Sequence, residues 1–579
     1  MLTRSVVPLA LGALALLSTP AFAIGARSQP LKFAAQGVTS IATAAKVAPG
    51  AAAATGADAP RENDREQKHQ AMVEKLASSR RSLLTAAQLA ASTAALPHLT
   101  GLHLADENEG ASGFNGINNF DQSAVNSGFS VEPPDQGLCV GNGFVFEGVN
   151  DAFSVYSENG GLRAGPAQSN AFFGVPFALN VSDPKCLYDP ASNRWFVTMI
   201  EYDNLLSNNG IMLAVSQTGD PTGSFVVYRI DVTKDGSDFF PGDCPCLGDQ
   251  PLIGADANGF YVSTNAFGVF SFQGAQVYAI SKAALVKGAA SPPGVHFDQL
   301  SFLLPDVEFS FSIQPSSTSP GTKGDPGTEY LAQSMRARTL ENRIAVWTVN
   351  NTAALDGDLS KLSMSTVVIP TESYAQPVSA TQKAGPTPLA ERAAINDFAF
   401  GANEQNLDGS DQRMSQVMYR NGQLWTAIGT AAASDGSPVR DAIAWLVVNV
   451  SNPAAGPQAS MAAQGYLAGP ESSHLVYPAM AVNSKGNASM VFTLTGPQFF
   501  PSAAYWNFGS DSIHLLADGA VPQDGFSAYF FNRPRWGDYS AAAVAGDGSI
   551  WLATEFIPGG ARKVFANWGT FVGRIHQGD

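Results

Sequence analysis

One hairpin-sized pattern recurs along this chain from about residue 131 to its last residues. Each copy has a polar or proline anchor, a short apolar strand, a turn with glycine or asparagine, and an aromatic-rich strand. Six copies span 133–150, 183–202, 249–265, 411–430, 477–494 and 538–556, and a degenerate seventh spans 329–349. Repeats of a unit that cannot bury its own faces must stack or close on themselves. For strands, the usual result is a set of four-stranded blades around a channel.

A third strand with its own signature follows each core hairpin, as at 152–161 and 275–285, and most copies continue into a fourth extended run. The last copy reaches the end of the chain without a fourth strand. Because a closed ring leaves no open edge, we expect residues near 120–131 to supply it. The sequence therefore predicts an all-β fold, a seven-bladed β-propeller over residues 111–579.

The first 23 residues have the pattern of a signal peptide. Arg4 precedes an apolar run at 6–17, and Ala21-Phe22-Ala23 forms a small-x-small cleavage site. An uncleaved anchor is the alternative, but the apolar run is short for a bilayer. We expect a secreted or periplasmic protein with no membrane span after cleavage.

Residues 24–110 are expected to form a linker and a helical N-terminal segment. Residues 24–58 are rich in small residues without an apolar period, which is typical of a linker. Residues 60–92 are predicted to form one short helix, with Pro60 suited to its first turn. The segment is expected to be dispensable for the propeller.

The charge balance excludes some partners. The chain has 33 Lys and Arg against 49 Asp and Glu, a net charge of −16. This field repels nucleic-acid phosphates and anionic lipids, and it tolerates cations and neutral or basic ligands. Solubility outside the cell explains the same charge without any ligand. We expect a monomer that does not bind nucleic acid.

The four cysteines are Cys139, Cys186, Cys244 and Cys246. In an oxidising compartment disulfides are the default, although four cysteines allow three pairings. Cys139 and Cys186 occupy similar places on neighbouring repeats, which favours that pair, whereas a bond between Cys244 and Cys246 would be strained. A soft-metal site is the alternative, but no histidines stand at ligand spacing.

Acidic anchors begin the innermost strand of several repeats, where that strand enters the channel. They are Asp135, Asp183, Asp249, Asp411 and Asp538. A carboxylate ring could bind Ca²⁺ or supply the paired acids of glycoside hydrolysis. The structural alternative is that each Asp accepts backbone hydrogen bonds in the turn before its strand. No metal site is predicted, and Ca²⁺ is the ion considered for this carboxylate ring.

The segment RWGDYS (535–540) carries two further candidates. Arg535 and Trp536 could clamp a carboxylate or stack on a sugar, although Arg535 could equally pack across a blade junction. Glu201 and Glu555 follow the second core strand of their repeats and could act as mouth-facing acids. The ligand-binding candidates are therefore Asp135, Asp183, Asp249, Asp538, Arg535 and Trp536, and the catalytic residues are unknown.

Motifs for other chemistries are absent. The seven histidines form no metal-binding spacing, and no nucleophile elbow, phosphate loop or dinucleotide fingerprint occurs in its required context. We therefore expect no organic cofactor.

Four segments carry a resemblance to a known group. They are PPDQ…VGNGF…VN (133–150), DP…YDPASNRW (183–195), QTGDPTGSF (217–225) and RWGDYS (535–540). They resemble secreted bacterial β-propellers related in shape to sialidases and other BNR-type proteins, a group with many members of unassigned function. True sialidase Asp-boxes are missing, and AGDGSIW (545–551) is only a worn relative, so sialidase activity is not expected.

Two functions remain open. The first is a non-catalytic propeller that binds a glycan, peptide or protein at its loop face or channel mouth. The second is a carbohydrate-active enzyme, a glycoside hydrolase or polysaccharide lyase, that uses carboxylates at the channel mouth. A close pair of non-anchor carboxylates at the channel mouth, with raised pKa values, would favour the second.

Overall fold

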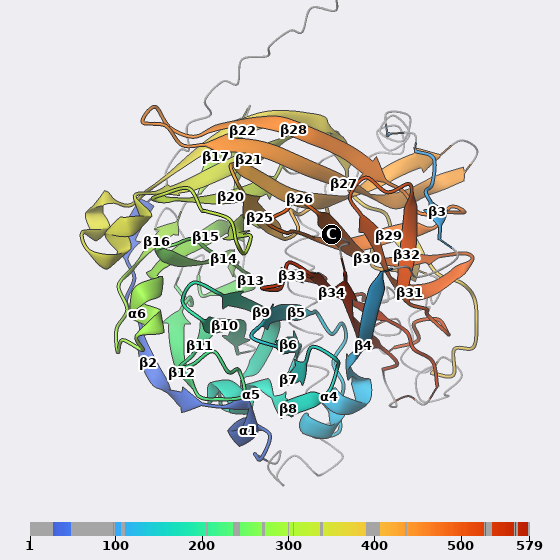
Figure 1. Cartoon of the computed structure of the whole chain (residues 1–579), viewed down its shortest axis with the longest axis horizontal. Helices are drawn as coiled ribbons and strands as arrows, with labels where there is room; N and C mark the ends of the chain where they lie inside the picture. The colour runs from blue at the N-terminus through green and yellow to red at the C-terminus, as the bar shows by residue number, and fades with distance from the viewer. Residues whose placement is uncertain are drawn as a thin grey trace, which may run out of the picture.

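The protein is built from antiparallel β-sheet units that radiate from a common centre (Figure 1). The computed structural model describes residues 27–47, 96–97, 99–105, 110–203, 207–234, 244–268, 272–298, 300–304, 306–335, 340–389, 406–434, 437–525, 527, 535–560, 562 and 566–576. The predicted signal peptide (1–23) and the predicted helix (60–92) lie outside these residues.

The units follow one another along the chain, and within each unit successive strands pair as neighbours. The first unit contains β5 (Gly137–Gly141), β6 (Phe144–Val149), β7 (Ala152–Ser157) and β8 (Leu162–Gln168), the second contains β9 (Asn180–Asp189), β10 (Arg194–Tyr202), β11 (Gly210–Ser216) and β12 (Phe225–Asp231), and the third contains β13 (Cys246–Ala255), β14 (Gly259–Gly268), β15 (Phe272–Ser281) and β16 (Gly294–Asp298). The next unit contains β19 (Gln314–Thr318), β20 (Thr328–Ser334), β21 (Leu340–Asn350) and β22 (Ser363–Ala375), and the unit after it contains β25 (Val417–Arg420), β26 (Gln423–Ser434), β27 (Ser437–Ser451) and β28 (Gln458–Leu467). Then follow a unit with β29 (His474–Val482), β30 (Ala488–Gly496), β31 (Phe499–Asn507) and β32 (Ser512–Ala517), and the last unit with β33 (Ala541–Val544), β34 (Ile550–Phe556) and β35 (Gly569–Ile575).

Smaller elements connect or decorate the units. Two short hairpins are β17 (Ser301–Leu304) with β18 (Asp306–Phe309), and β23 (Ala380–Thr381) with β24 (Asn406–Leu407). The helices are α1 (Ile41–Ala44), α4 (Asn119–Val125), α5 (Ser169–Phe173), α6 (Lys282–Val286), η2 (Thr352–Asp356) and η3 (Leu359–Lys361). None of the helices that the structure describes has the length and apolar character of a membrane span.

The first strands of the units lie around the centre, and the last strands lie at the rim (Figure 1). Short parallel pairs join β13 to β19 and β19 to β25, so three successive units share hydrogen bonds near the axis. This order, from centre to rim, is that of a β-propeller.

The hydrophobic core lies between neighbouring units. Phe196 of β10 stacks on Phe260 of β14 with ring centroids 4.8 Å apart, and Tyr330 stacks on Tyr419 at 5.6 Å. The last unit packs on the first in the same way, because Trp551 of β34 shares a buried cluster with residues of β5 and β6. The face-to-face packing therefore continues around the axis and closes.

The closing strand lies earlier in the chain than the sequence predicts. Strand β4 (Ala111–Asn118) pairs with β35 from Ile575↔Ala111 to Gly569↔Asn118. Residues near 120–131 do not form this strand, because Asn118 caps helix α4 and accepts hydrogen bonds from the backbone of Phe120 and Asp121. The prediction that a strand from the N-terminal side closes the last unit is confirmed, but the predicted position of that strand, near residues 120–131, was wrong.

Residues before 111 also belong to the sheets. Strand β1 (Arg27–Pro30) pairs with β16, β2 (Ala34–Thr39) pairs with β12, and β3 (His103–Leu104) pairs with β32. The linker interpretation of 24–58 is therefore wrong for residues 27–39. The domain boundary near 111 stays a prediction.

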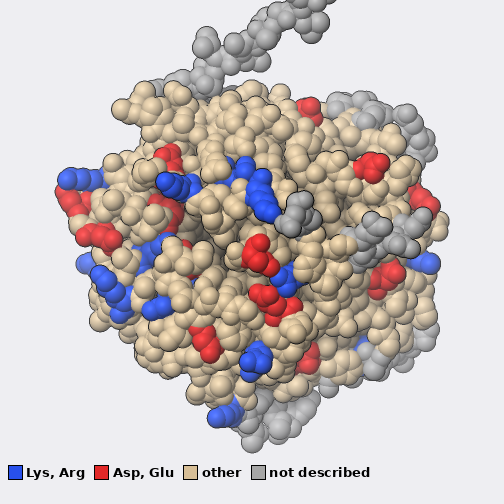
Figure 2. Space-filling model, in the orientation of Figure 1, with Lys and Arg blue, Asp and Glu red and all other residues tan. Residues whose placement is uncertain are grey.

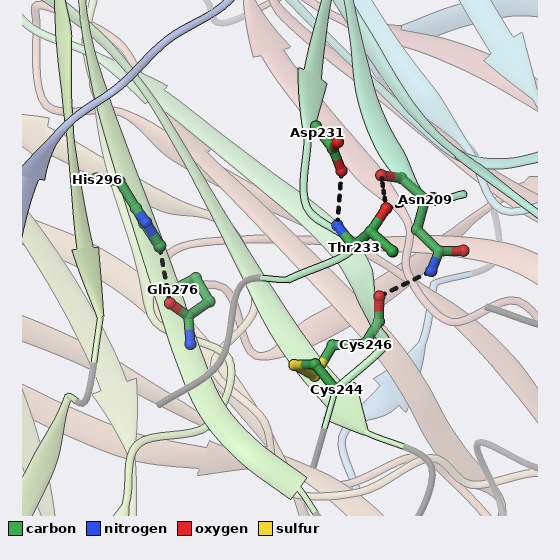
Figure 3. The surroundings of a disulfide bond; sticks show 7 residues. All are labelled: Asn209, Asp231, Thr233, Cys244, Cys246, Gln276 and His296. Atoms are coloured by element: carbon green, nitrogen blue, oxygen red, sulfur yellow. Dashed lines mark hydrogen bonds between the residues drawn. A yellow bond between two sulfur atoms is a disulfide. The ribbon is translucent and has the colours of Figure 1, made fainter. Parts of the chain in front are cut away.

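Both cysteine pairs are bonded. The predicted Cys139–Cys186 disulfide links β5 to β9 across two units, with Cα atoms 5.6 Å apart. Cys244 and Cys246, which the sequence analysis did not favour as a pair, form the second bond (Figure 3). The Cys246 carbonyl accepts a 2.8 Å hydrogen bond from the side chain of Asn209, which ties this disulfide to the neighbouring unit.

Candidate functional site

The anchors mark a bulge at the start of the innermost strands. Asp183 has a φ of 62° and precedes a proline, and opposite it the ladder between β9 and β10 shifts register. Gln250 and Tyr477 repeat this arrangement, each with positive φ, a following proline and a register shift. Asp tolerates the left-handed region better than most residues, so part of the recurrence of Asp is structural.

The register of the anchors is not uniform. Asp135 has a φ of 49° and matches Asp183, whereas in the third unit the left-handed residue is Gln250 and Asp249 lies one position earlier. Asp135 and Asp183 are buried, at 3% and 7% exposure, while Asp249 and Asp538 stay partly exposed. The carboxylates that the sequence treats as equivalent therefore divide into an enclosed pair and an accessible pair.

Asp135 connects the first and last units. Its Oδ1 accepts a 2.6 Å hydrogen bond from the backbone N–H of Asp538, and its Oδ2 accepts a 2.9 Å bond from Asn150. Asn150 also accepts the backbone N–H of Asp183 at 2.9 Å. One amide side chain thus holds two anchors in place.

The pKa values indicate that four anchors share one electrostatic environment. Burial raises the pKa of Asp183 to about 6, and the charge of Asp538 adds to this rise. Burial, followed by the charges of Asp538 and Asp183, raises the pKa of Asp135 well above its ordinary value. Burial, followed by the charges of Asp183 and Asp538, also raises the pKa of Asp249 well above its ordinary value. The structure therefore brings the predicted carboxylates together around the axis.

Arg535 contributes positive charge to this group. Its guanidinium lies 2.9 Å from Asp538 and 3.2 Å from Asp408, the residue that follows β24. Arg535 therefore lies beside an anchor carboxylate, and its role in binding a ligand stays a prediction.

Trp536 was misassigned as a sugar-stacking residue. Its side chain is 1% exposed, lies in a hydrophobic cluster with Trp568, and donates a 3.0 Å hydrogen bond to Thr493. Both faces of the indole are covered by the protein, so no sugar can stack on it in this conformation.

Three residues that the sequence analysis missed lie among the anchors. Lys185 places its Nζ 2.8 Å from the ring centroid of Tyr539, and Arg413 forms a bidentate ion pair with Asp411 at 2.7 and 2.9 Å. Burial lowers the pKa of Lys185 to about 7, against the opposing charges of Asp183 and Asp135. Each stands one or two residues after an anchor, which is the only signal that could have found them.

A cavity of about 140 Å³ lies along the axis beside these residues. Polar and charged side chains from several innermost strands line it, namely Gln136, Lys185, Gln250, Gln314, Asp411, Arg413, Gln416, Asp441, Asp538 and Tyr539. Apolar residues such as Leu252 and Met418 complete the wall. A cavity with a few converging polar groups and perturbed pKa values is the usual form of a ligand site.

Two further acids lie behind the anchors. Burial raises the pKa of Glu132 to about 8. Burial also raises the pKa of Glu555 well above its ordinary value, and the charges of Glu132 and Asp135 add to this rise. Glu555 accepts a 3.0 Å hydrogen bond from the backbone of Gly537, next to Asp538. These non-anchor carboxyls have raised pKa values, but they are 2% and 3% exposed and neither lines the cavity, so they are not the pair at the channel mouth that would favour an enzyme. Glu201, the other acid considered, forms an ion pair with Arg229.

The described part of the chain contains no group of three or more His, Cys, Asp or Glu arranged to hold a metal. The four anchors interact electrostatically. Binding of Ca²⁺ to them, considered from the sequence, stays a hypothesis.

The face of the protein shown in Figure 2 has no large patch of one charge. On the face shown in Figure 2, acidic and basic side chains are few and mixed over a largely uncharged surface. The axial cavity, with its concentration of carboxyls, is the more distinctive feature.

No family model and no curated protein matches the sequence. Similar solved structures include an α-L-arabinanase of Penicillium chrysogenum complexed with arabinobiose, with 9% identity, a TM-score of 0.30, and coverage of 76% of this chain and 94% of that one. A putative exo-β-1,3-galactanase of Bifidobacterium bifidum s17 has 12% identity, a TM-score of 0.26, and coverage of 58% and 94%. The Dos1 propeller has 8% identity, a TM-score of 0.31, and coverage of 75% and 76%. At these scores no activity or site is carried over.

Proposed function

We propose that this protein is a carbohydrate-active enzyme that hydrolyses glycosidic bonds at its axial cavity. The observation that carries the proposal is the partly exposed pair Asp249 and Asp538, whose charges interact but whose surroundings differ. Asp538 lines the cavity, and Asp249 directly precedes Gln250, which also lines it. Glycoside hydrolysis needs two such carboxyl groups, one that donates a proton and one that acts as a carboxylate.

Asp249 suits the role of general acid. Burial and the neighbouring anchors raise its pKa, so it keeps a proton at a pH at which an ordinary Asp has lost it. That proton would pass to the oxygen of the leaving sugar.

Asp538 suits the role of the carboxylate. It lies 2.9 Å from the Arg535 guanidinium, and it would activate a water molecule or attack the sugar carbon. Asp135 fixes the backbone at Asp538 through its 2.6 Å hydrogen bond, so Asp135 is a positioning residue.

The finer features of the architecture and location belong to the same proposal. We take the successive units as seven blades of a closed ring, related to the sialidase-like propellers that the sequence resembles. Cleavage after residue 23 would place a monomeric enzyme in the periplasm or outside the cell, where its substrate is an extracellular glycan. The proposed reaction uses no cofactor.

Binding without cleavage is the second candidate. It is favoured by the left-handed backbone at Asp135 and Asp183, which assigns those anchors to the construction of the strands. In that case the cavity would hold a glycan, a peptide or a protein segment, and no bond would break. A polysaccharide lyase is a variant of the first candidate.

The experiment measures reducing-end release by the protein from residue 24 onward against a panel of plant, fungal and bacterial polysaccharides, with binding measured in parallel. Asp249→Asn and Asp538→Asn should each lower turnover of a cleaved glycan by about 100-fold or more. Asp518→Asn, at an exposed acid outside the cavity, is the control and should be fully active. Full activity of both site variants would overturn the assignment, and binding of a glycan without any cleavage would favour the second candidate.

A further inference from the structure

Lys185 occupies an unusual position for an ammonium group. Its Nζ lies over the face of Tyr539, and among the described residues it forms no ion pair within 4.0 Å and no hydrogen bond. Asp183, Asp135 and Asp538 nevertheless act on its charge. An aromatic face surrounded by carboxylates is a favourable environment for any ammonium, because the ring quadrupole and the carboxylates both attract positive charge.

Tyr539 supplies a second, independent observation. Its side chain is 9% exposed, it lines the axial cavity, and its hydroxyl has no hydrogen-bond partner among the residues that the structure describes. All four anchors act on this hydroxyl. A buried hydroxyl without a partner is costly, which is what a ligand would relieve.

An organic ammonium fits this place, whereas no three described His, Cys, Asp or Glu residues are arranged as metal ligands. A lysine side chain is a flexible stem with a compact ammonium at its end, and Lys185 lines the cavity. When Lys185 moves aside, the aromatic face and the carboxylates remain.

We propose that the Lys185 ammonium holds the place of a substrate ammonium, and that the glycan bound at the axial cavity carries an amino sugar with a free amine. The ligand ammonium would lie on the ring of Tyr539, between Asp183 and Asp135, and a neighbouring oxygen of the sugar would accept a hydrogen bond from the Tyr539 hydroxyl.

This inference rests on the proposed function and names its substrate class. It is also consistent with the roles given above, because exchange of one ammonium for another leaves the charge near Asp249 unchanged.

The first test compares binding of a β-1,4-linked glucosamine tetramer with its fully N-acetylated form at pH 6, by calorimetry on the whole protein from residue 24 onward. The amine form should bind at least tenfold more tightly. Equal binding of the two forms would overturn the proposal. Tetralysine is the third ligand, and tighter binding of tetralysine than of the glucosamine tetramer would assign the place to a peptide and overturn the sugar.

Two variants test the place itself. Lys185→Met removes the internal competitor and should tighten binding of the glucosamine tetramer about fivefold or more, whereas Lys361→Met, at an exposed lysine, should change nothing. If Lys185→Met folds and its affinity for the glucosamine tetramer is unchanged, the ligand ammonium does not replace the Lys185 ammonium, and the proposal is overturned. If that variant does not fold, Tyr539→Leu decides, because loss of the ring should abolish the preference for the amine, and a retained preference would overturn the proposal.

Cleavage is scored separately, which keeps the two proposals distinguishable. Hydrolysis of a neutral glycan without any preference for amines would leave the proposed function standing and overturn this inference. Selective binding of the amine without hydrolysis of any glycan would support this inference and overturn the proposed function.

Discussion

The backbone N–H of Asp538 donates a 2.6 Å hydrogen bond to the carboxylate of Asp135, although the two residues are 403 positions apart in the sequence. Asp135 leads into the first unit of the propeller and Asp538 leads into the last. The same contact therefore joins the two ends of the ring and holds one member of the proposed catalytic pair.

Removal of the Asp135 carboxyl is expected to affect both stability and activity. In Asp135→Ala, the partly buried N–H of Asp538 and the amide of Asn150 lose their acceptor, which should cost about 1–3 kcal/mol of unfolding free energy. Turnover should fall because Asp538 is no longer fixed. Urea unfolding followed by tryptophan fluorescence measures the first effect. Asp518→Ala, at an exposed acid, is the control, and a variant of Asp135 as stable as that control would contradict the contact.

Trp536 is expected to contribute to stability and not to ligand contact. Trp536→Phe keeps most of the apolar volume but removes the indole N–H that bonds Thr493, so the loss should be about 1 kcal/mol. Affinity for any bound glycan should stay within twofold of the parent. Phe177→Ala, at a phenylalanine that is 46% exposed, should leave both quantities unchanged. A large loss of affinity in a stable Trp536→Phe would restore the sugar-stacking interpretation.

Local sequence was sufficient to predict the repeating units and the Cys139–Cys186 bond, because hairpin periodicity and matched positions on adjacent repeats are local signals. The N-terminal strands escaped prediction for a physical reason. Strand β2 is an edge strand that is mostly exposed and is held by backbone hydrogen bonds, so it has no apolar alternation to detect.

The site was predictable only in part. The anchors recur in sequence, but their neighbours Lys185 and Tyr539 meet only through the curvature of the ring. Trp536 was misassigned because a buried aromatic and a sugar-stacking aromatic look alike in a sequence. Which anchors are accessible depends on the register of each bulge, as the one-residue offset of Asp249 shows.

Glu147 is expected to make stability depend on pH at the closure of the ring. Its carboxylate accepts hydrogen bonds from the backbone of Ile117 and from Thr570, but burial raises its pKa from 4.5 to about 7. The folded protein therefore keeps a proton that the unfolded chain releases between these values. The stabilisation is complete below pH 4.5 and is lost as the pH rises to 7, a change of up to about 3 kcal/mol.

Glu147→Gln removes this titration and tests its sign. As the pH is raised from 5 to 8, the parent should lose stability and the variant should not, so the variant should become more stable relative to the parent. Glu471→Gln, at an exposed glutamate, should follow the parent at every pH. A difference between Glu147→Gln and the parent that is constant with pH would contradict the raised pKa.

The closing strand is tested by one added methyl group. A Cβ at Gly116 of β4 would collide with both carboxylate oxygens of Glu147 and with the hydroxyl of Thr570, whereas a Cβ at Gly37 of the edge strand β2 would meet nothing within 4 Å. Gly116→Ala should therefore lower the unfolding free energy by about 1–3 kcal/mol, and Gly37→Ala should change it by less than about 0.5 kcal/mol. Combining Gly116→Ala with Glu147→Ala removes the main obstacle, so the alanine at 116 should cost less in that background than alone. If Gly116→Ala is as stable as Gly37→Ala, then β4 does not pack against Glu147, and another segment must close the ring.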